Sequence, residues 1–81
     1  MKLPRDLSGE DLAKALKVLG YEVTRQTGSH LRLTTKAPSE HHVTIPAHRS
    51  LRIGTLVSVL QDVATHLKVS RDEVQRKLFG R

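Results

Sequence analysis

Residues 21–36 read YEVTRQTGSHLRLTTK, and this stretch sets the architecture of the chain. Polar residues alternate with β-branched or apolar residues in 21–27 and again in 30–36, which predicts two strands. Gly28-Ser29 between them is a typical two-residue hairpin turn. Because successive side chains of a strand point to opposite faces, the second strand has two different faces. One face carries Leu31 and Leu33, and the other carries His30, Arg32, Thr34 and Lys36.

The chain before this hairpin predicts a helix that ends at Gly20. Ser8 is suited to cap the helix, and Asp11 follows three residues later, as in a capping box. Apolar residues then recur at helical spacing, namely Leu12, Ala15, Leu16 and Leu19. Gly20 suits the left-handed conformation that often follows a helix end.

The chain after the hairpin predicts one more strand and two helices. Residues 41–45 form a third short strand, which Pro46 stops. A basic loop follows, and the second helix begins with Thr55 as its candidate cap. The apolar stripe of this helix consists of Leu56, Val59, Leu60, Val63 and Leu67. Ser70 caps a short third helix that extends to Phe79.

This order of elements, helix, three strands, helix and short helix, predicts an α+β fold. Short connections make the strands an antiparallel meander. Each element has one apolar face, so we expect the main helices to pack on one face of the sheet. The other face stays open to solvent, where His42 and Thr44 of the third strand are expected beside the polar residues of the second.

Length and charge limit the range of functions. The 81 residues fit one small domain, residues 1–81. The chain has 14 Lys and Arg against 8 Asp and Glu, a formal net charge of +6, which favours a polyanion partner such as nucleic acid. The alternative is a basic surface that serves solubility alone. Aromatic residues make up only 2%, which argues against RNA-binding modules that stack bases on aromatic rings.

Other classes of protein are excluded by what the sequence lacks. It has no cysteine, so disulfides and zinc sites with thiolate ligands are ruled out. No segment approaches the roughly 20 apolar residues of a membrane span, and the first residues lack the apolar core of a signal peptide. We therefore expect a cytoplasmic protein without membrane contact.

His30 is the leading candidate for chemistry. It follows the turn and lies on the polar face of its strand, which gives the side chain a rigid base and access to solvent. Imidazole exchanges protons near neutral pH, which suits attack of a ribose 2′-hydroxyl on its own phosphate. Arg32 or Lys36 is suited to hold that phosphate. The alternative is an exposed histidine without a role.

The other histidines of this region are weaker candidates. His41 and His42 are adjacent on a strand and point to opposite faces, so they do not readily share a metal ion. A site made of His30, His42 and His48 has no recognised ligand spacing and no partnering carboxylate, so we expect no metal ion and no other cofactor. His48 lies in a basic loop, Pro46 through Arg52, together with Arg49 and Arg52, where the amides of the next helix suit a phosphate. The alternative is a loop that is simply exposed to water.

Four segments of the chain together resemble the HicA-type toxins of bacterial and archaeal toxin–antitoxin pairs. They are residues 12–21 (LAKALKVLGY), 25–30 (RQTGSH), 43–48 (VTIPAH) and 51–56 (LRIGTL). The Gly-Ser-His turn, the Pro-x-His loop and the Gly-Thr-Leu helix start occur in the same order. The resemblance covers nearly the whole chain, from the first helix to the last.

The resemblance implies a fold like that of a double-stranded-RNA-binding domain. It also implies metal-independent cleavage of mRNA and neutralisation by a HicB-type antitoxin. His30, in the Gly-Ser-His turn, matches the catalytic histidine of the family, whereas Leu31 stands where a second histidine is common. The RNA-binding residues that we predict are Gly28, Ser29, Arg32, Lys36, His48, Arg49 and Arg52.

Two other functions remain open from the sequence. One is a non-catalytic module that binds double-stranded RNA, for which a lysine-rich start of the last main helix is expected. Residues 49–55 read RSLRIGT and are only moderately basic. The other is a protein-interaction domain whose positive surface only docks an acidic antitoxin.

Overall fold

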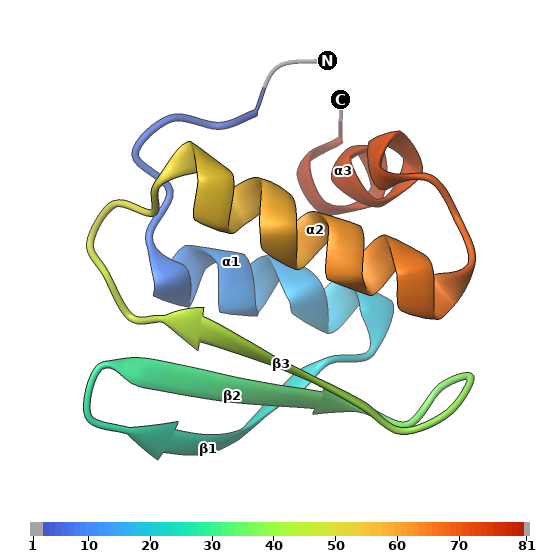
Figure 1. The fold of residues 1–81 in the computed structure, drawn as a ribbon, viewed down its shortest axis with the longest axis horizontal. Coiled ribbons are helices and arrows are strands. Elements are labelled where there is room, and N and C mark those ends of the chain that lie inside the picture. Colours follow the sequence, from blue (N-terminus) through green and yellow to red (C-terminus); the bar gives the residue numbers. More distant parts are fainter. Residues whose placement is uncertain (1–2, 81) are drawn as a thin grey trace.

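The computed structural model describes residues 3–80, which form one sheet with helices packed against it (Figure 1). The elements in chain order are α1 (Gly9–Leu16), the 3-10 turn η1 (Lys17–Leu19), β1 (Glu22–Thr27), β2 (His30–Thr35), β3 (His41–Pro46), α2 (Ile53–Leu67) and α3 (Arg71–Phe79). The strands are antiparallel in the order β1-β2-β3, and the helices lie on one side of the sheet (Figure 1). The predicted α+β meander is confirmed, and its arrangement is consistent with the fold of a double-stranded-RNA-binding domain.

The β1–β2 hairpin forms as the sequence predicts. Thr27 pairs with His30 across the two-residue turn, and Gly28 has a φ of 53°, which is the positive angle that such turns require. Along β2, Leu31 and Leu33 are buried whereas the residues between them and before them are exposed. The alternation of this central strand therefore separates a core face from a solvent face.

Two strand ends differ by one residue from the prediction. β2 ends at Thr35, whose hydroxyl is within 3.4 Å of both the nitrogen and the oxygen of Ala37, so Lys36 lies outside the strand. β3 includes Pro46, which pairs with His30. Pro46 is the last residue of an edge strand, where a missing N–H group removes no bond between strands.

β1 does not have the apolar face that its alternating sequence predicts. The pairing register shifts between Val23 and Arg25, which marks a β-bulge, and all residues of the strand are exposed. Because a bulge inserts one extra residue, the side chains directed toward α1 are Val23 and Gln26, three positions apart. Tyr21, which we predicted as the first residue of this strand, precedes it and is fully buried.

The caps of α1 and α3 are confirmed. The Ser8 hydroxyl accepts a hydrogen bond from the Asp11 N–H at 3.0 Å, and the Asp11 carboxylate accepts one from the Ser8 N–H at 3.4 Å. The Ser70 hydroxyl accepts a bond from the Glu73 N–H at 3.1 Å. Gly20 has a φ of 89° and ends the 3-10 turn that follows α1. These bonds satisfy amides that the first turn of a helix leaves without partners.

The start of α2 was predicted wrongly. The helix begins at Ile53 rather than near Thr55, and no side chain caps it. The chain is fixed just before this point by a hydrogen bond from the Leu51 N–H to the Leu7 oxygen at 2.7 Å. This bond joins segments that are far apart in the sequence, so local capping patterns do not reveal it. The predicted apolar stripe is buried at Leu56, Val59, Leu60 and Val63 and half-buried at Leu67.

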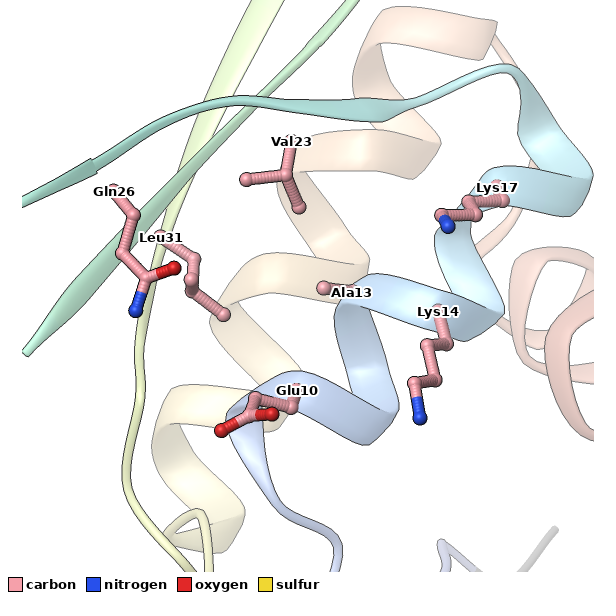
Figure 2. Close-up of a pocket in the computed structure, with 7 residues that line it drawn as sticks. All are labelled: Glu10, Ala13, Lys14, Lys17, Val23, Gln26 and Leu31. Carbon is pink, nitrogen blue, oxygen red and sulfur yellow. The ribbon is translucent and has the colours of Figure 1, made fainter.

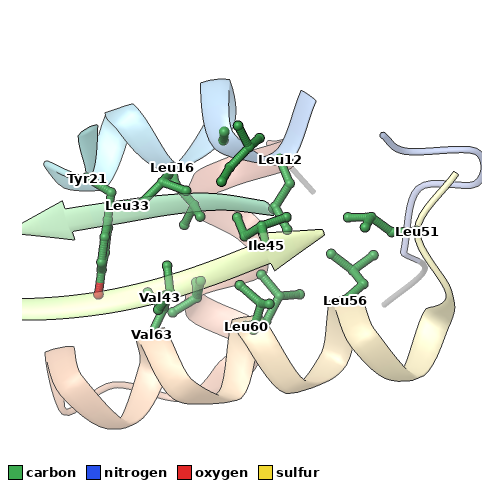
Figure 3. Close-up of a cluster of buried hydrophobic side chains, with 14 of the residues drawn as sticks. Leu12, Leu16, Tyr21, Leu33, Val43, Ile45, Leu51, Leu56, Leu60 and Val63 are labelled. Carbon is green, nitrogen blue, oxygen red and sulfur yellow. The ribbon is translucent and has the colours of Figure 1, made fainter. Parts of the chain in front are cut away.

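The core lies between the sheet and the helices (Figure 3). Side chains from α1, α2, β2 and β3 meet there, and the largest that are fully buried include Tyr21, Leu12, Leu16, Leu33, Ile45, Leu56 and Leu60. In α1 the buried alanine is Ala13, whereas Ala15, which we predicted in the stripe, is only half-buried. The helices therefore anchor β2 and β3 by one face and leave the other face uncovered.

Gly9 joins the start of α1 to the end of β3. Its N–H donates to the His48 oxygen at 3.0 Å, and a Cβ atom placed on Gly9 would collide with the backbone oxygen of Pro46. We expect Gly9→Ala to lower the free energy of unfolding by about 1 to 3 kcal/mol, because backbone cannot yield as a flexible side chain does. Urea unfolding of the purified variant measures this change.

Gly54→Ala is the matched control for this substitution. Gly54 is also in the first turn of a helix, but no atom lies within 4 Å of a Cβ placed there. Alanine is the better helix former, so we expect no loss of stability and a gain of up to about 1 kcal/mol. Equal effects of the two substitutions would contradict the close packing at Gly9.

Candidate active site on the open sheet face

β2 presents a row of polar side chains on the sheet face that no helix covers (Figure 1). His30 and Arg32 are exposed and Thr34 is half-buried. Their partners across the strands are Thr27, Arg25 and Glu22 of β1 and Pro46, Thr44 and His42 of β3. His42 and Thr44 are exposed, as expected for residues of this face. We call this surface the open face.

His30 is the first residue of the central strand. Its backbone is paired with Thr27 on one side and Pro46 on the other, which fixes the position of its Cα atom. Its side chain is exposed, and the ring makes no hydrogen bond or ion pair with any residue in 3–80. The imidazole therefore stands on a rigid base and is free to contact a substrate.

The basic loop of residues 47–52 begins at the same end of the sheet. The Ala47 N–H donates to the Ser29 oxygen at 2.6 Å, which continues the pairing of β2 and β3 into the turn. The bond between Gly9 and His48 holds the next residue of the loop. The side chains of His48, Arg49 and Arg52 are exposed. The fold thus brings the Gly28-Ser29 turn, His30 and the start of the basic loop together.

Lys36 lies away from this group. It follows the opposite end of β2, six positions after His30, which corresponds to about 20 Å at about 3.3 Å per residue. Arg32 is two positions from His30 on the same face, which corresponds to about 7 Å. Of the two cations that we considered for the phosphate beside His30, the structure therefore brings only Arg32 close.

A chain of hydrogen bonds crosses the open face at the far end of β2. The Thr24 and Thr34 hydroxyl oxygens are 2.9 Å apart, and the Thr34 oxygen is 2.7 Å from Nδ1 of His42. Nε2 of His42 is 3.0 Å from a carboxylate oxygen of Glu40. Sequence reasoning missed this chain because the bulge in β1 decides which residues face each other. The one local sign of this chain in the sequence was that Glu40 and His42 are two positions apart, a spacing that lets their side chains meet.

His41 points to the opposite face from His42, as predicted. Its Nδ1 is 2.7 Å from the Tyr21 hydroxyl, and its Nε2 is 3.3 Å from a carboxylate oxygen of Asp62. The ring also stacks on His66, with ring centroids 4.3 Å apart. These contacts tie β3 to α2 and to the segment before β1. His41 and His66 are therefore part of the packing and are not presented on the open face.

The hydroxyl of Tyr21 keeps its proton over a wide pH range in this packing. Burial, and then the negative charge of Asp62, raises the pKa of Tyr21 to about 12. Both causes disfavour the tyrosinate anion. The neutral hydroxyl therefore serves in the hydrogen bond with His41 and is not a reactive group.

The structure does not gather the histidines that we considered for a metal site. His42 is bonded to Glu40 and Thr34, whereas His30 lies at the other end of β2 and His48 begins the basic loop. Within residues 3–80 no group of three or more His, Cys, Asp or Glu side chains is arranged to hold a metal ion. Each helix in this part of the chain is too short or too polar to cross a membrane.

A separate hollow lies on the helix side of the sheet, between α1 and β1 (Figure 2). Glu10 and Lys14 of α1 and Lys17 of η1 line it, together with Val23 of the bulged strand. It is open because β1, an edge strand, is not covered by the helices as β2 and β3 are. Since it is on the other side of the sheet from His30, it is not part of the candidate site.

Residues 9–64 match the family model described as the HicA toxin of bacterial toxin–antitoxin systems. No curated protein and no solved structure matches the chain. The matched range begins with α1 and ends within α2, so it contains the hairpin, β3, the basic loop and every residue of the candidate site. Because this range is well over half of the 81 residues, the chain belongs to the HicA family of toxins from bacterial toxin–antitoxin systems.

Proposed function

We propose that this toxin is a ribonuclease that cleaves mRNA without a metal ion, with His30 as a general acid or base. The observation that carries the proposal is that some histidine rings contact other side chains of the protein and others do not. His41, His42 and His66 contact other side chains, whereas His30 and His48 are exposed and their rings have no hydrogen-bond partner in residues 3–80. His30 directly follows the turn, and His48 follows Ala47, whose N–H is bonded to the Ser29 oxygen. The two histidines are exposed, and no neighbouring side chain in residues 3–80 engages their rings.

The chemistry needs one proton acceptor, one proton donor and a cation. In the proposed reaction His30 takes the proton of a ribose 2′-hydroxyl while that oxygen attacks the adjacent phosphorus. The bond from phosphorus to the 5′-oxygen breaks, the leaving oxygen takes a proton from solvent water, and a 2′,3′-cyclic phosphate remains. Arg32, on the same face, stabilises the charge that develops on the phosphate oxygens. Gly28 and Ser29 form the turn at the same end of the sheet, and the loop that carries His48, Arg49 and Arg52 starts there, so these five residues remain predicted RNA contacts.

The antitoxin is the second partner in this proposal. A toxin of this family acts within a toxin–antitoxin system, so a protein of the opposite function accompanies it. We propose that a HicB-type antitoxin covers the open face and thereby blocks the access of RNA to His30. The toxin has a net charge of +6, so an acidic antitoxin would associate quickly, and added salt would slow its association.

Binding of double-stranded RNA without cleavage is the alternative function, because the fold is consistent with that of a double-stranded-RNA-binding domain. Such a module needs a cationic helix start that grips phosphates across the grooves. Here α2 starts with Arg52 at the cap position followed by Ile53 and Gly54, so a single cation stands where several are expected. The helix start is therefore less suited to this function than the hairpin end is to cleavage.

Incubation of the purified protein with a mixed RNA in the presence of a chelator tests the proposed function. We expect the RNA to be cut. A gel shift without cleavage would instead identify a binding module, and the absence of both would identify a protein-docking domain. The chelator separates activity of this chain from that of contaminating metal-dependent nucleases.

A further inference from the structure

Two arginines face each other across β1 and β2 on the open face. Arg25 and Arg32 are direct partners in the strand register, and both side chains are exposed. Neither has a carboxylate within 4.0 Å in the described part of the chain. Like charges at directly opposite positions of a sheet destabilise it. A bound anion would remove this repulsion.

The neighbouring groups form a hollow around these arginines. Its volume is about 410 Å³, and it is lined by Thr24, Arg25, Arg32, Thr34, Glu40 and His42. The hydrogen bonds from Thr24 through Thr34 to His42 fix the floor of this hollow. Glu40 is the one carboxylate in the hollow, and it is bonded to His42 rather than to an arginine. Two unpaired guanidinium groups therefore remain for a ligand.

We propose that this hollow binds a phosphodiester of single-stranded RNA, next along the strand from the phosphodiester that is cleaved at His30, so that Arg25 holds the neighbouring phosphate and Arg32 contacts both. Guanidinium groups match the oxygens of a phosphate with two parallel hydrogen bonds each, and hydroxyls beside them donate further bonds. Arg32 is about 7 Å from His30 along β2, a separation similar to that of neighbouring phosphates in a nucleic acid strand. The inference rests on the proposed function for the identity of the ligand, and it adds Arg25 to the RNA-binding residues.

An RNA oligonucleotide with 2′-O-methyl groups is the probe that tests the hollow, because it binds without being cut. We expect Arg25→Ala to weaken its binding about tenfold, as loss of a charge-assisted hydrogen bond does. Arg25→Lys keeps the charge but not the paired hydrogen bonds, so its loss should be smaller. Arg76→Ala is the matched control, because Arg76 is exposed on α3, on the helix side of the sheet, and should change binding less than about twofold. Fluorescence anisotropy measures all four proteins.

Glu40→Gln tests the same hollow in the opposite direction. Glutamine keeps an acceptor for His42 but removes the negative charge beside the phosphate, so we expect binding to strengthen about two- to fivefold. Binding by Arg25→Ala equal to that of Arg76→Ala would overturn the proposal. So would an Arg25→Ala variant that loses affinity for a poly-glutamate peptide but not for the RNA, because the hollow would then serve an acidic protein.

These measurements do not depend on cleavage. His30→Ala should bind the 2′-O-methyl probe within about twofold of the unchanged protein, since the arginines supply most of the affinity. If cleavage proves absent but Arg25→Ala still weakens binding, the ribonuclease proposal fails and the subsite stands. If cleavage depends on His30 but Arg25→Ala binds normally, the subsite fails and the ribonuclease proposal stands.

Discussion

Replacing His30 by alanine is expected to reduce RNA cleavage by about 10² to 10⁴-fold, the usual effect of removing a positioned proton-transfer group. The free energy of unfolding should change by no more than about 0.5 kcal/mol, because the side chain is exposed and has no partner in residues 3–80. The decisive measurement is the single-turnover cleavage rate of the folded variant, with its urea unfolding curve recorded in parallel.

Two outcomes of that experiment are informative. Near-normal cleavage by folded His30→Ala would contradict the assignment of His30 as general acid or base. Lost cleavage together with retained binding of the 2′-O-methyl probe would place the defect in the chemical step. The backbone pairing of residue 30 with Thr27 and Pro46 does not involve its side chain, so the variant is expected to fold.

Raising the salt concentration fourfold is expected to weaken RNA binding about 50-fold. Four exposed arginines border the proposed RNA path, namely Arg25, Arg32, Arg49 and Arg52. If each neutralises one phosphate of a single strand, log Kd should change with log salt by about 0.7 for each arginine, or about 2.8 in total. This dependence arises because bound cations release counterions from the RNA.

Variants of these arginines show how much each contributes to the total salt slope. Arg32→Ala should lower the salt slope by about 0.7 and the double variant of Arg49 and Arg52 by about 1.4, whereas Arg76→Ala should leave it unchanged. Lys36→Ala reports how far the RNA extends beyond the far end of β2. A salt slope that is the same in all of these variants would remove the open face from the RNA-binding surface.

The central hairpin could be predicted because its signals are local. The Gly28-Ser29 turn fixes the register of its two strands, and the alternation around Leu31 and Leu33 fixes which face is buried. The same holds for the caps at Ser8 and Ser70, whose bonds span three residues. Exposure of His30 on the open face followed directly from this alternation.

The features that could not be predicted depend on contacts between distant segments. Residues 24–27 are all polar, so the alternation of apolar and polar residues in the sequence does not reveal the bulge between Val23 and Arg25. The pairing of Arg25 with Arg32 follows from the two-residue turn, whereas the bulge decides that Val23 pairs with Leu33 and Glu22 with Thr34. The start of α2 depends on a hydrogen bond to Leu7, and a local search for a capping residue therefore selected Thr55 instead.

Cleavage at a site where the RNA carries a single 2′-deoxyribose tests the central claim most directly. The account requires the 2′-hydroxyl to be the attacking group, with His30 as its proton acceptor or as the donor to the leaving oxygen. We predict that RNA is cut to leave 2′,3′-cyclic phosphate and 5′-hydroxyl ends, and that one 2′-deoxy substitution before the cut bond abolishes cleavage at that bond alone. Cleavage that continues at the 2′-deoxy position would contradict the account.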